Sequence, residues 1–213
     1  MPSKVLLDSP FPENLPVVGS CLECNHGFSK DEEYLACLMQ ALIDGTTDPA
    51  MMSRKRIRAS LERSPPLRAR IDAALKLTPG PELDAERARI TKVLLKLARG
   101  HAAFELSRAF TQEPSMFWWS PLSQLSAEAL NSFEDIVHSG PLGEVGSRNS
   151  QRLMVMQLTL RGPDGSLVQQ GFLANDWVDV QDERYRYFAC EAGGKAQIRI
   201  VVGEYLACYA SWD

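Results

Sequence analysis

Apolar positions recur at helical spacing through the first two thirds of the chain. Between residues 29 and 44 they return every three or four positions, which places them on one face of a helix. Ser29-Lys30-Asp31-Glu32 fits a capping box at its start. The apolar residues of this stretch are Tyr34, Leu35, Leu38, Met39 and Leu42. The same kind of pattern predicts further helices over residues 48–63, 66–76, 83–111 and 126–138, with prolines and glycines between them.

The pattern changes after residue 150, where apolar and β-branched residues favour strands. Strands are predicted over residues 153–160, 166–172, 185–190, 197–202 and 205–212, and residues 14–18 form a short extended segment. Helices that precede antiparallel strands indicate an α+β fold, a mostly helical N-terminal and central body followed by a C-terminal antiparallel β-sheet. By composition the chain divides into residues 1–45, 46–140 and 141–213, and the last part can form one compact domain with the helices.

Composition excludes several classes of protein. A chain of 213 residues that is 45% hydrophobic has enough apolar side chains for a sizeable core, so disorder is not expected. No apolar run approaches the roughly 18 residues of a membrane span, and the N-terminus lacks a signal-peptide core. We therefore expect a cytoplasmic protein without a membrane partner. The odd count of 5 cysteines indicates reduced thiols or metal ligands in that compartment.

A net charge of −4 gives no general attraction to nucleic acid, so such binding needs a local patch. Residues 51–70 supply one, with Glu62 as the only acid. Its basic residues are Arg54, Lys55, Arg56, Arg58, Arg63, Arg68 and Arg70. The segment is a candidate DNA-binding surface that follows a phosphate backbone. The alternative is a solvated helical face, because no aromatic residues interleave with the charges.

Cys21 and Cys24 form a Cys-x-x-Cys pair directly before the first predicted helix. This spacing can direct two sulfurs to one zinc ion, but a structural site needs four ligands and the sequence has no second such pair. The alternative is two ordinary thiols in a turn. His101 and Glu105, four residues apart in a predicted helix, are expected to form a surface pair rather than an acid–base site. Residues 117–119, Phe-Trp-Trp, are expected to pack between the helices and the strands rather than to line a pocket.

The run from Pro12 to Tyr34, with Asn14-Leu15, the Cys pair and Asn25-His26, resembles the second half of a bacterial HNH-endonuclease-type treble clef. The resemblance implies that Cys21 and Cys24 bind structural zinc together with an upstream Cys-x-x-Cys. It also implies that Asn14 shapes a turn between two strands and that Asn25 helps to hold a divalent catalytic metal. The implied reaction is metal-dependent phosphodiester hydrolysis.

The sequence departs from the pattern of this family, because the 213 residues lack the upstream Cys-x-x-Cys and the acid–His pair that supplies the general base. Met1-Pro2-Ser3-Lys4 resembles the residues that follow this histidine, so the reading frame is expected to continue upstream. The chain as given is expected to hold neither zinc nor catalytic metal and to leave DNA uncut. The competing hypothesis is a non-catalytic binding or assembly protein that keeps a vestigial motif, and a homo-oligomer is left open.

Overall fold

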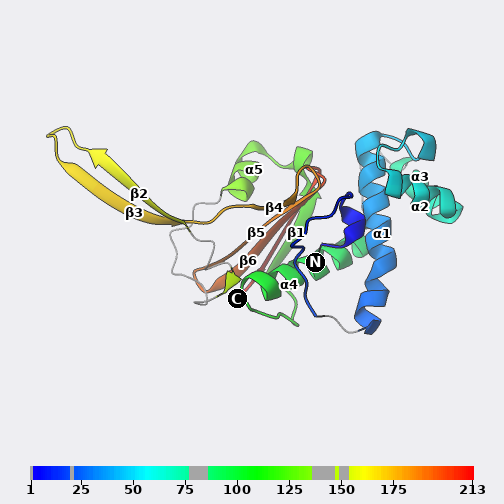
Figure 1. Cartoon of the computed structure of the whole chain (residues 1–213), viewed down its shortest axis with the longest axis horizontal. Helices are drawn as coiled ribbons and strands as arrows, with labels where there is room; N and C mark the ends of the chain where they lie inside the picture. The colour runs from blue at the N-terminus through cyan, green and yellow to red at the C-terminus, as the bar shows by residue number, and fades with distance from the viewer. Residues whose placement is uncertain (1, 20–21, 77–85, 136–146, 149–153) are drawn as a thin grey trace.

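A computed structural model describes residues 2–19, 22–76, 86–135, 147–148 and 154–213. Within them, α1 to α4 precede all the strands and six of the seven strands follow α5, while β1 lies between α4 and α5; this order confirms the α+β prediction. Figure 1 shows α5 on one side of the main sheet, α4 on the other, and α1 crossing the end of α4. The helices are α1 Leu22–Asp44, α2 Lys55–Arg63, α3 Pro65–Lys76, α4 Arg87–Glu105 and α5 Ala127–Glu134, with 3-10 turns at Lys4–Leu6, Pro49–Met51 and Leu122–Gln124.

The strands form two separate antiparallel sheets. The main sheet has five strands in the order β1-β7-β6-β5-β4, and β2 pairs only with β3. Gly193 and Gly194, with φ of 60° and 78°, make the tight turn between β5 and β6, a conformation that glycine adopts without a Cβ clash. The strands are β1 Met116–Pro121, β2 Met154–Arg161, β3 Leu167–Ala174, β4 Val178–Gln181, β5 Tyr185–Ala192, β6 Lys195–Val202 and β7 Leu206–Trp212.

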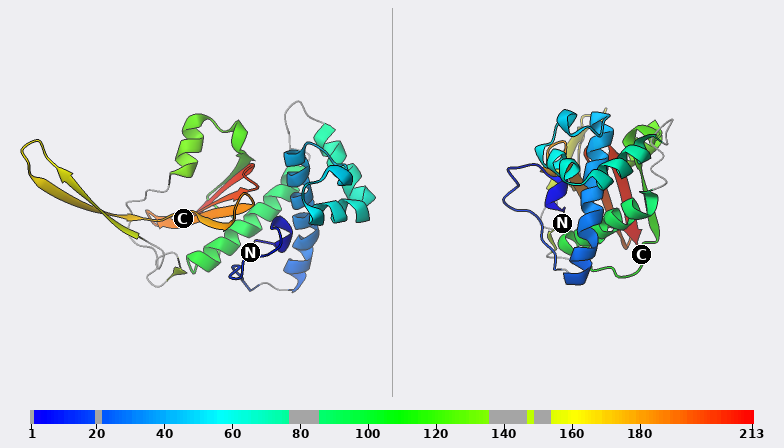
Figure 2. Two further views of the ribbon diagram at one scale, coloured as in Figure 1. Left: turned by 45° about the horizontal axis from the view of Figure 1, so that its top comes forward. Right: turned by 90° about the vertical axis from the view of Figure 1, so that its right-hand side faces the viewer.

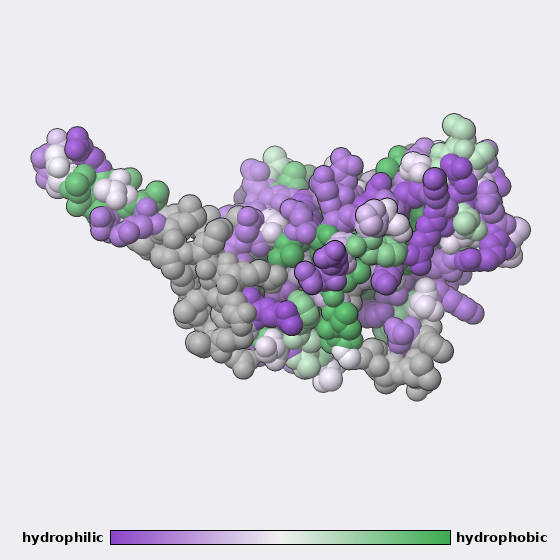
Figure 3. Space-filling model, in the orientation of Figure 1, coloured by the Kyte–Doolittle hydropathy of each residue, from purple (hydrophilic) through white to green (hydrophobic). Residues whose placement is uncertain are grey.

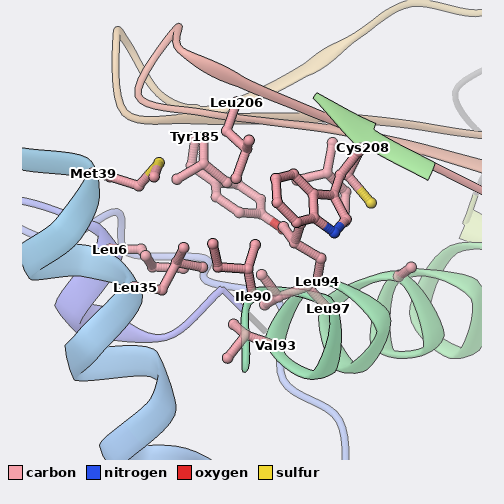
Figure 4. Packing of buried hydrophobic residues seen from close by; sticks show 14 of the residues in the cluster. Leu6, Leu35, Met39, Ile90, Val93, Leu94, Leu97, Tyr185, Leu206 and Cys208 are labelled. Atoms are coloured by element: carbon pink, nitrogen blue, oxygen red, sulfur yellow. The ribbon is translucent and has the colours of Figure 1, made fainter. Parts of the chain in front are cut away.

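Side chains alternate between the two faces of the main sheet, as a strand period of two requires. On β6, Ile198 and Ile200 belong to the large core with α1 and α4, whereas Val201 packs with α5. Figure 4 shows Ile90, Val93, Leu94 and Leu97 of α4 packed beneath the sheet. Leu6, Leu35 and Met39 lie beside them. A single core therefore joins the N-terminal segment, the central helices and the sheet.

α1 begins at Leu22 rather than at residue 29, so the prediction of its start is wrong. Contacts from α4 hold the added turns: Lys92 Nζ lies 2.6 Å from Asp31 Oδ2, and it donates to the Gly27 carbonyl at 3.4 Å. Tertiary contacts of this kind extend a helix beyond its local capping signal. Residues 11–18 lie in no strand, and Cys24 and Asn25 belong to the helix rather than to a turn before it.

Other predicted boundaries also shift. The helix predicted over 83–111 runs only from Arg87 to Glu105, because Ser107 adopts a left-handed φ of 57° and the Arg108 amide closes on the Ala102 carbonyl. The helix predicted over 48–63 divides into a 3-10 turn and α2. The helix predicted over 126–138 is capped by the Ser126 side chain as expected and ends at Glu134. Residues 83–85 and 136–138 lie outside the described part.

The hairpin of β2 and β3 projects from the body of the molecule (Figures 1 and 2). Its register pairs Leu160 with Val168 and Arg161 with Leu167. Large apolar side chains on it are exposed, with 48% to 63% of their surface accessible for Leu158, Leu160, Leu167 and Val168. Figure 3 shows apolar residues gathered on this projection.

Candidate nucleic-acid interface

The first candidate surface is the basic segment around α2, and the structure uses much of its charge internally. Arg54 is only 7% exposed. Its Nε donates to Asp8 Oδ1 at 2.6 Å and its Nη2 donates to the Leu7 carbonyl at 2.8 Å. Arg58 Nη2 donates to the Met52 carbonyl at 2.8 Å. Lys55 and Arg56 are exposed. Among the basic residues 54, 55, 56 and 58, only these two have a fully solvent-exposed charged side chain.

The arginines that continue the segment are paired with acids. Arg63 lies 2.8 Å from Glu33, Arg70 lies 2.7 Å from Glu86, and Arg68 lies 3.9 Å from Asp48. Exposed ion pairs are weak and a polyanion can displace them. They nevertheless reduce the local positive potential that the sequence pattern alone suggested.

A second group of cations lies on α4. Arg89, Lys92, Lys96 and Arg99 are spaced by three, four and three residues, so they share one helix face. We name this group the α4 cationic stripe. It faces α1: Lys92 and Arg89 both contact Asp31, at 2.6 and 3.1 Å, and Lys96 contacts Glu32 at 2.6 Å. Three cations thus meet two carboxylates of α1, and Arg99 lies 3.0 Å from Glu113. Every cation of the stripe therefore has an acidic partner, as the arginines near α2 do, and a polyanion would have to compete with these carboxylates.

Asn25, Phe28 and Glu32 of α1 lie opposite the α4 cationic stripe. The Lys92 and Lys96 ammonium groups are 5.1 and 4.8 Å from the centre of the Phe28 ring, a cation–π arrangement. One cleft of about 340 Å³ lies here, and its polar lining includes Asn25, Glu32, Lys96 and Arg99. The rest of its lining is Ser3, Val18, Gly19, Leu97, Gly100, Ala103, Ala109 and Phe110. The structure therefore brings the sequence-predicted Asn25 beside two cations that the sequence reasoning did not select.

The remaining residues implied by the resemblance do not join this cleft in the described part. Asn14 is exposed and lies in a turn, and it is not among the residues that line the cleft. Cys21 lies outside the described residues. Cys24 lies in α1, and its side chain is not placed.

The described residues offer no metal centre: no three of their His, Cys, Asp or Glu side chains are grouped to hold an ion. Cys21 and the Cys24 side chain lie outside the residues that the structure describes, so the zinc site implied by the resemblance stays a prediction. Cys37, Cys190 and Cys208 are buried. Burial raises the pKa of the Cys37 thiol to about 12 and that of Cys190 to about 11, so both remain protonated thiols at neutral pH.

His101 and Glu105 do not form a surface pair, and that prediction is wrong. Both side chains are completely buried between α4 and β5. His101 Nε2 lies 2.7 Å from the Tyr185 hydroxyl, and the Tyr187 hydroxyl donates to Glu105 Oε1 at 2.5 Å. The His101 ring also stacks on the Tyr187 ring at 3.7 Å. Hydroxyl groups from a distant strand thus bind one polar atom of each side chain, which lowers the free-energy cost of burying them.

The sequence carried a signal for the α4 cationic stripe that the reasoning missed. Positions 89, 92, 96 and 99 of the predicted helix alternate by three and four in the same way as its apolar positions. Phe28 lies outside the basic segments in sequence, so only the fold places an aromatic ring among the charges.

Comparisons with protein-family models, curated proteins and solved structures gave no match. None of the described helices has the length and apolarity to cross a membrane.

Proposed function

We propose that this protein binds nucleic acid, with the phosphate backbone lying along the α4 cationic stripe beside Asn25. The observation that carries the proposal is the cleft that Asn25, Lys96 and Arg99 line together. Cations along one groove attract a phosphate chain, and an aromatic ring among them offers a surface for a base. Phe28 supplies that ring. The partner is nucleic acid in general, since no base-specific side-chain pattern is evident.

The HNH-like resemblance adds a reaction to this proposal. Metal-dependent hydrolysis of a phosphodiester needs a group that deprotonates water, and the 213 residues lack the acid–His pair that does so in the resembled family. We therefore propose binding for these residues, and hydrolysis for a form that also carries this pair. In such a form Asn25 would lie in the lining of the phosphate-binding cleft, and its side-chain oxygen would be one ligand of the catalytic metal.

The binding test is fluorescence anisotropy with labelled single-stranded and double-stranded DNA, titrated at several salt concentrations. Lys92→Glu is the informative variant. Its side chain is half exposed, and Asp31 keeps Arg89 as a partner. Because the variant also loses the donor to the Gly27 carbonyl, circular dichroism first checks that α1 is intact. We expect about tenfold weaker binding and a salt slope reduced by about one.

The matched control is Lys55→Glu, which makes the same charge change on the exposed side of α2. Its binding should stay within about twofold of the parent chain, because Lys55 lies away from the cleft. A larger loss of DNA affinity in Lys55→Glu than in Lys92→Glu would show that the α2 segment, and not the α4 cationic stripe, is the interface. Undetectable binding of the parent chain at low salt would contradict nucleic-acid binding altogether.

The competing function, a non-catalytic assembly protein, is favoured by the exposed leucines of the hairpin. Leu160 and its register partner Val168 are 53% and 55% exposed on a two-stranded sheet. Exposed apolar side chains at this density are typical of contact surfaces. Light scattering of the parent chain and of Leu160→Lys separates the two functions, because assembly through the hairpin predicts an oligomer that the substitution dissociates.

A further inference from the structure

The second face of the main sheet, opposite α4, carries a cleft that the proposed function does not use. α5 covers only part of this face (Figure 1). The cleft has a volume of about 440 Å³, within the range of small-molecule sites. Its walls include Trp118 of β1, Tyr209 of β7 and Phe133 of α5. The Trp118 and Tyr209 rings stack on each other with their centres 5.9 Å apart and 15° between their planes, so the cleft has aromatic rings in its wall.

Arg199 of β6 lies at this cleft and is buried, with 7% of its surface exposed. Its Nη1 donates to the Phe133 carbonyl at 2.7 Å and to the Asp135 carbonyl. Its Nε is buried and has no hydrogen-bond partner among the described residues. No carboxylate among the described residues lies within ion-pair distance of Arg199, although the charges of Asp135 and Glu134 act on it from farther away. Burial therefore opposes its charge and lowers the pKa of the guanidinium, although an arginine stays protonated at neutral pH.

Arg186 on the neighbouring strand shows what is missing at Arg199. Its Nε and Nη2 donate to the two carboxylate oxygens of Glu204 at 2.8 and 3.0 Å. The equivalent edge of Arg199 is left without an acceptor by the described residues. A buried cation that lacks an anion costs free energy, and an anion that reaches it regains part of that cost.

We propose that this cleft binds a small molecule made of a planar aromatic ring and one carboxylate. The ring would pack against the aromatic wall of Trp118 and Tyr209, and the carboxylate would approach the part of the Arg199 guanidinium that lines the cleft. A monoanion fits best because Arg199 is the only charged residue among the described residues of the lining. A phosphate ester would bring more negative charge than one guanidinium balances. Ser132 and Gln197 add two neutral hydrogen-bonding groups.

The ligand itself supplies the first test, with no change to the protein. Indole-3-carboxylate and its neutral analogue indole-3-carboxamide have nearly the same shape. Isothermal titration calorimetry should give a Kd below about 1 mM for the carboxylate, and binding at least tenfold weaker for the amide. Equal affinity for both compounds would show that Arg199 does not recognise the carboxylate and would overturn the proposal. The absence of saturable binding of either compound would also overturn it.

Two variants locate the site. Ala129→Phe places a bulky ring into the cleft from an exposed position on α5, and it should abolish binding without a change in thermal stability. Arg199→Gln should weaken carboxylate binding at least tenfold and leave amide binding unchanged. The control is Arg108→Gln, which removes a cation paired with Glu191 away from the cleft and should bind like the parent. Unchanged carboxylate binding in Ala129→Phe would place the ligand elsewhere and overturn the proposal.

This site and the α4 cationic stripe lie on opposite sides of the main sheet. Lys92→Glu should therefore leave carboxylate binding unchanged, and Ala129→Phe should leave DNA binding unchanged. The two inferences can thus fail separately.

Discussion

Asp8 and Arg54 link three distant parts of the chain through one charged cluster. Asp8 accepts from Arg54 Nε at 2.6 Å and from Arg184 Nε at 2.6 Å. Gln181 adds a hydrogen bond from its amide to the Asp8 carbonyl at 3.0 Å. The N-terminal segment is thereby fastened both to the start of α2 and to the turn before β5. The basic residues of the α2 segment therefore divide into two kinds, those that hold the fold and those that face solvent.

Substitution of Arg54 distinguishes these two kinds. Arg54→Met leaves Asp8 with Arg184 alone and leaves the Leu7 carbonyl without its donor, so we expect the free energy of unfolding to fall by about 2–4 kcal/mol. Lys55→Met, at the next position, should change it by less than about 0.5 kcal/mol. Urea denaturation measures both. Similar effects of the two substitutions would mean that Arg54 is not a structural residue.

Asp8 should also make stability depend on acid. Burial, the largest single contribution, raises the pKa of Asp8, but the hydrogen bonds and charges of Arg54 and then Arg184 outweigh it and hold the pKa below its ordinary value of 3.8. A carboxyl whose pKa is lower in the folded state stabilises the fold above its unfolded pKa and loses that effect as the pH falls through the folded pKa.

The test compares the parent chain with Asp8→Asn by urea denaturation between pH 7 and about pH 2.5. Asp8→Asn should be the less stable at neutral pH, and the difference should shrink below about pH 4 as Asp8 of the parent becomes protonated. A difference that stays constant across this range would show that Asp8 gains nothing from its ionised form.

The burial of single charged residues was the part that sequence could not predict. Arg54 meets Asp8 across 46 residues, and His101 meets Tyr185 across 84. A local pattern describes neighbours at three or four positions and contains no information about such partners. His101 and Glu105 looked like an exposed pair for this reason, although a distant strand supplies the groups that make their burial possible.

At the scale of elements, sequence predicted best where a regular period was long enough to read. The apolar repeat of α1, the apolar face of α4 and the apolar runs of β6 and β7 all appear in the structure, the two strands being buried along most of their length. β1 and β4 were missed because Phe117, Trp118 and Trp119 show no alternation and β4 has only four residues. Each is defined by pairing with another strand rather than by its own pattern.

The hairpin is the element that should matter least to the stability of the body. Met154 and Ala174 are register partners at its base, so a two-residue turn can join them directly. Replacing residues 155–173 by Asn-Gly should change the free energy of unfolding by less than about 1 kcal/mol, because the hairpin side chains that the structure describes, at residues 157–169, are nearly all exposed. Thermal denaturation measures this, and light scattering should show less aggregation.

A large loss of stability on removal of the hairpin would show that it contacts the body more closely than its exposed side chains indicate. A milder variant, Leu158→Thr with Leu160→Thr, keeps the β propensity and removes only the apolar surface. It should leave thermal stability unchanged and reduce aggregation to the same extent.

At the scale of the whole molecule, the division of the sequence into three parts differs from the division of the core. Leu6 of the first part, Leu94 of the second and Tyr185 of the third belong to the same buried cluster. α4 supplies this continuity, because one of its faces packs on α1 and on the sheet. The charged face of α4 forms the proposed nucleic-acid interface, so its position relative to α1 depends on the same core.

One shared core predicts one cooperative unfolding transition. Far-ultraviolet circular dichroism reports mainly on the helices, whereas tryptophan fluorescence reports on the four tryptophans, all in or beside the main sheet. Two of them, Trp119 and Trp212, are only 7% and 1% exposed in the core. The two signals should change at the same urea concentration and with the same slope. Leu94→Ala, which opens a cavity between α4 and the sheet, should lower both midpoints together and reduce the free energy of unfolding by about 3 kcal/mol. Two separated transitions, or a shift of the fluorescence midpoint alone, would instead show that the helices and the sheet unfold as independent domains.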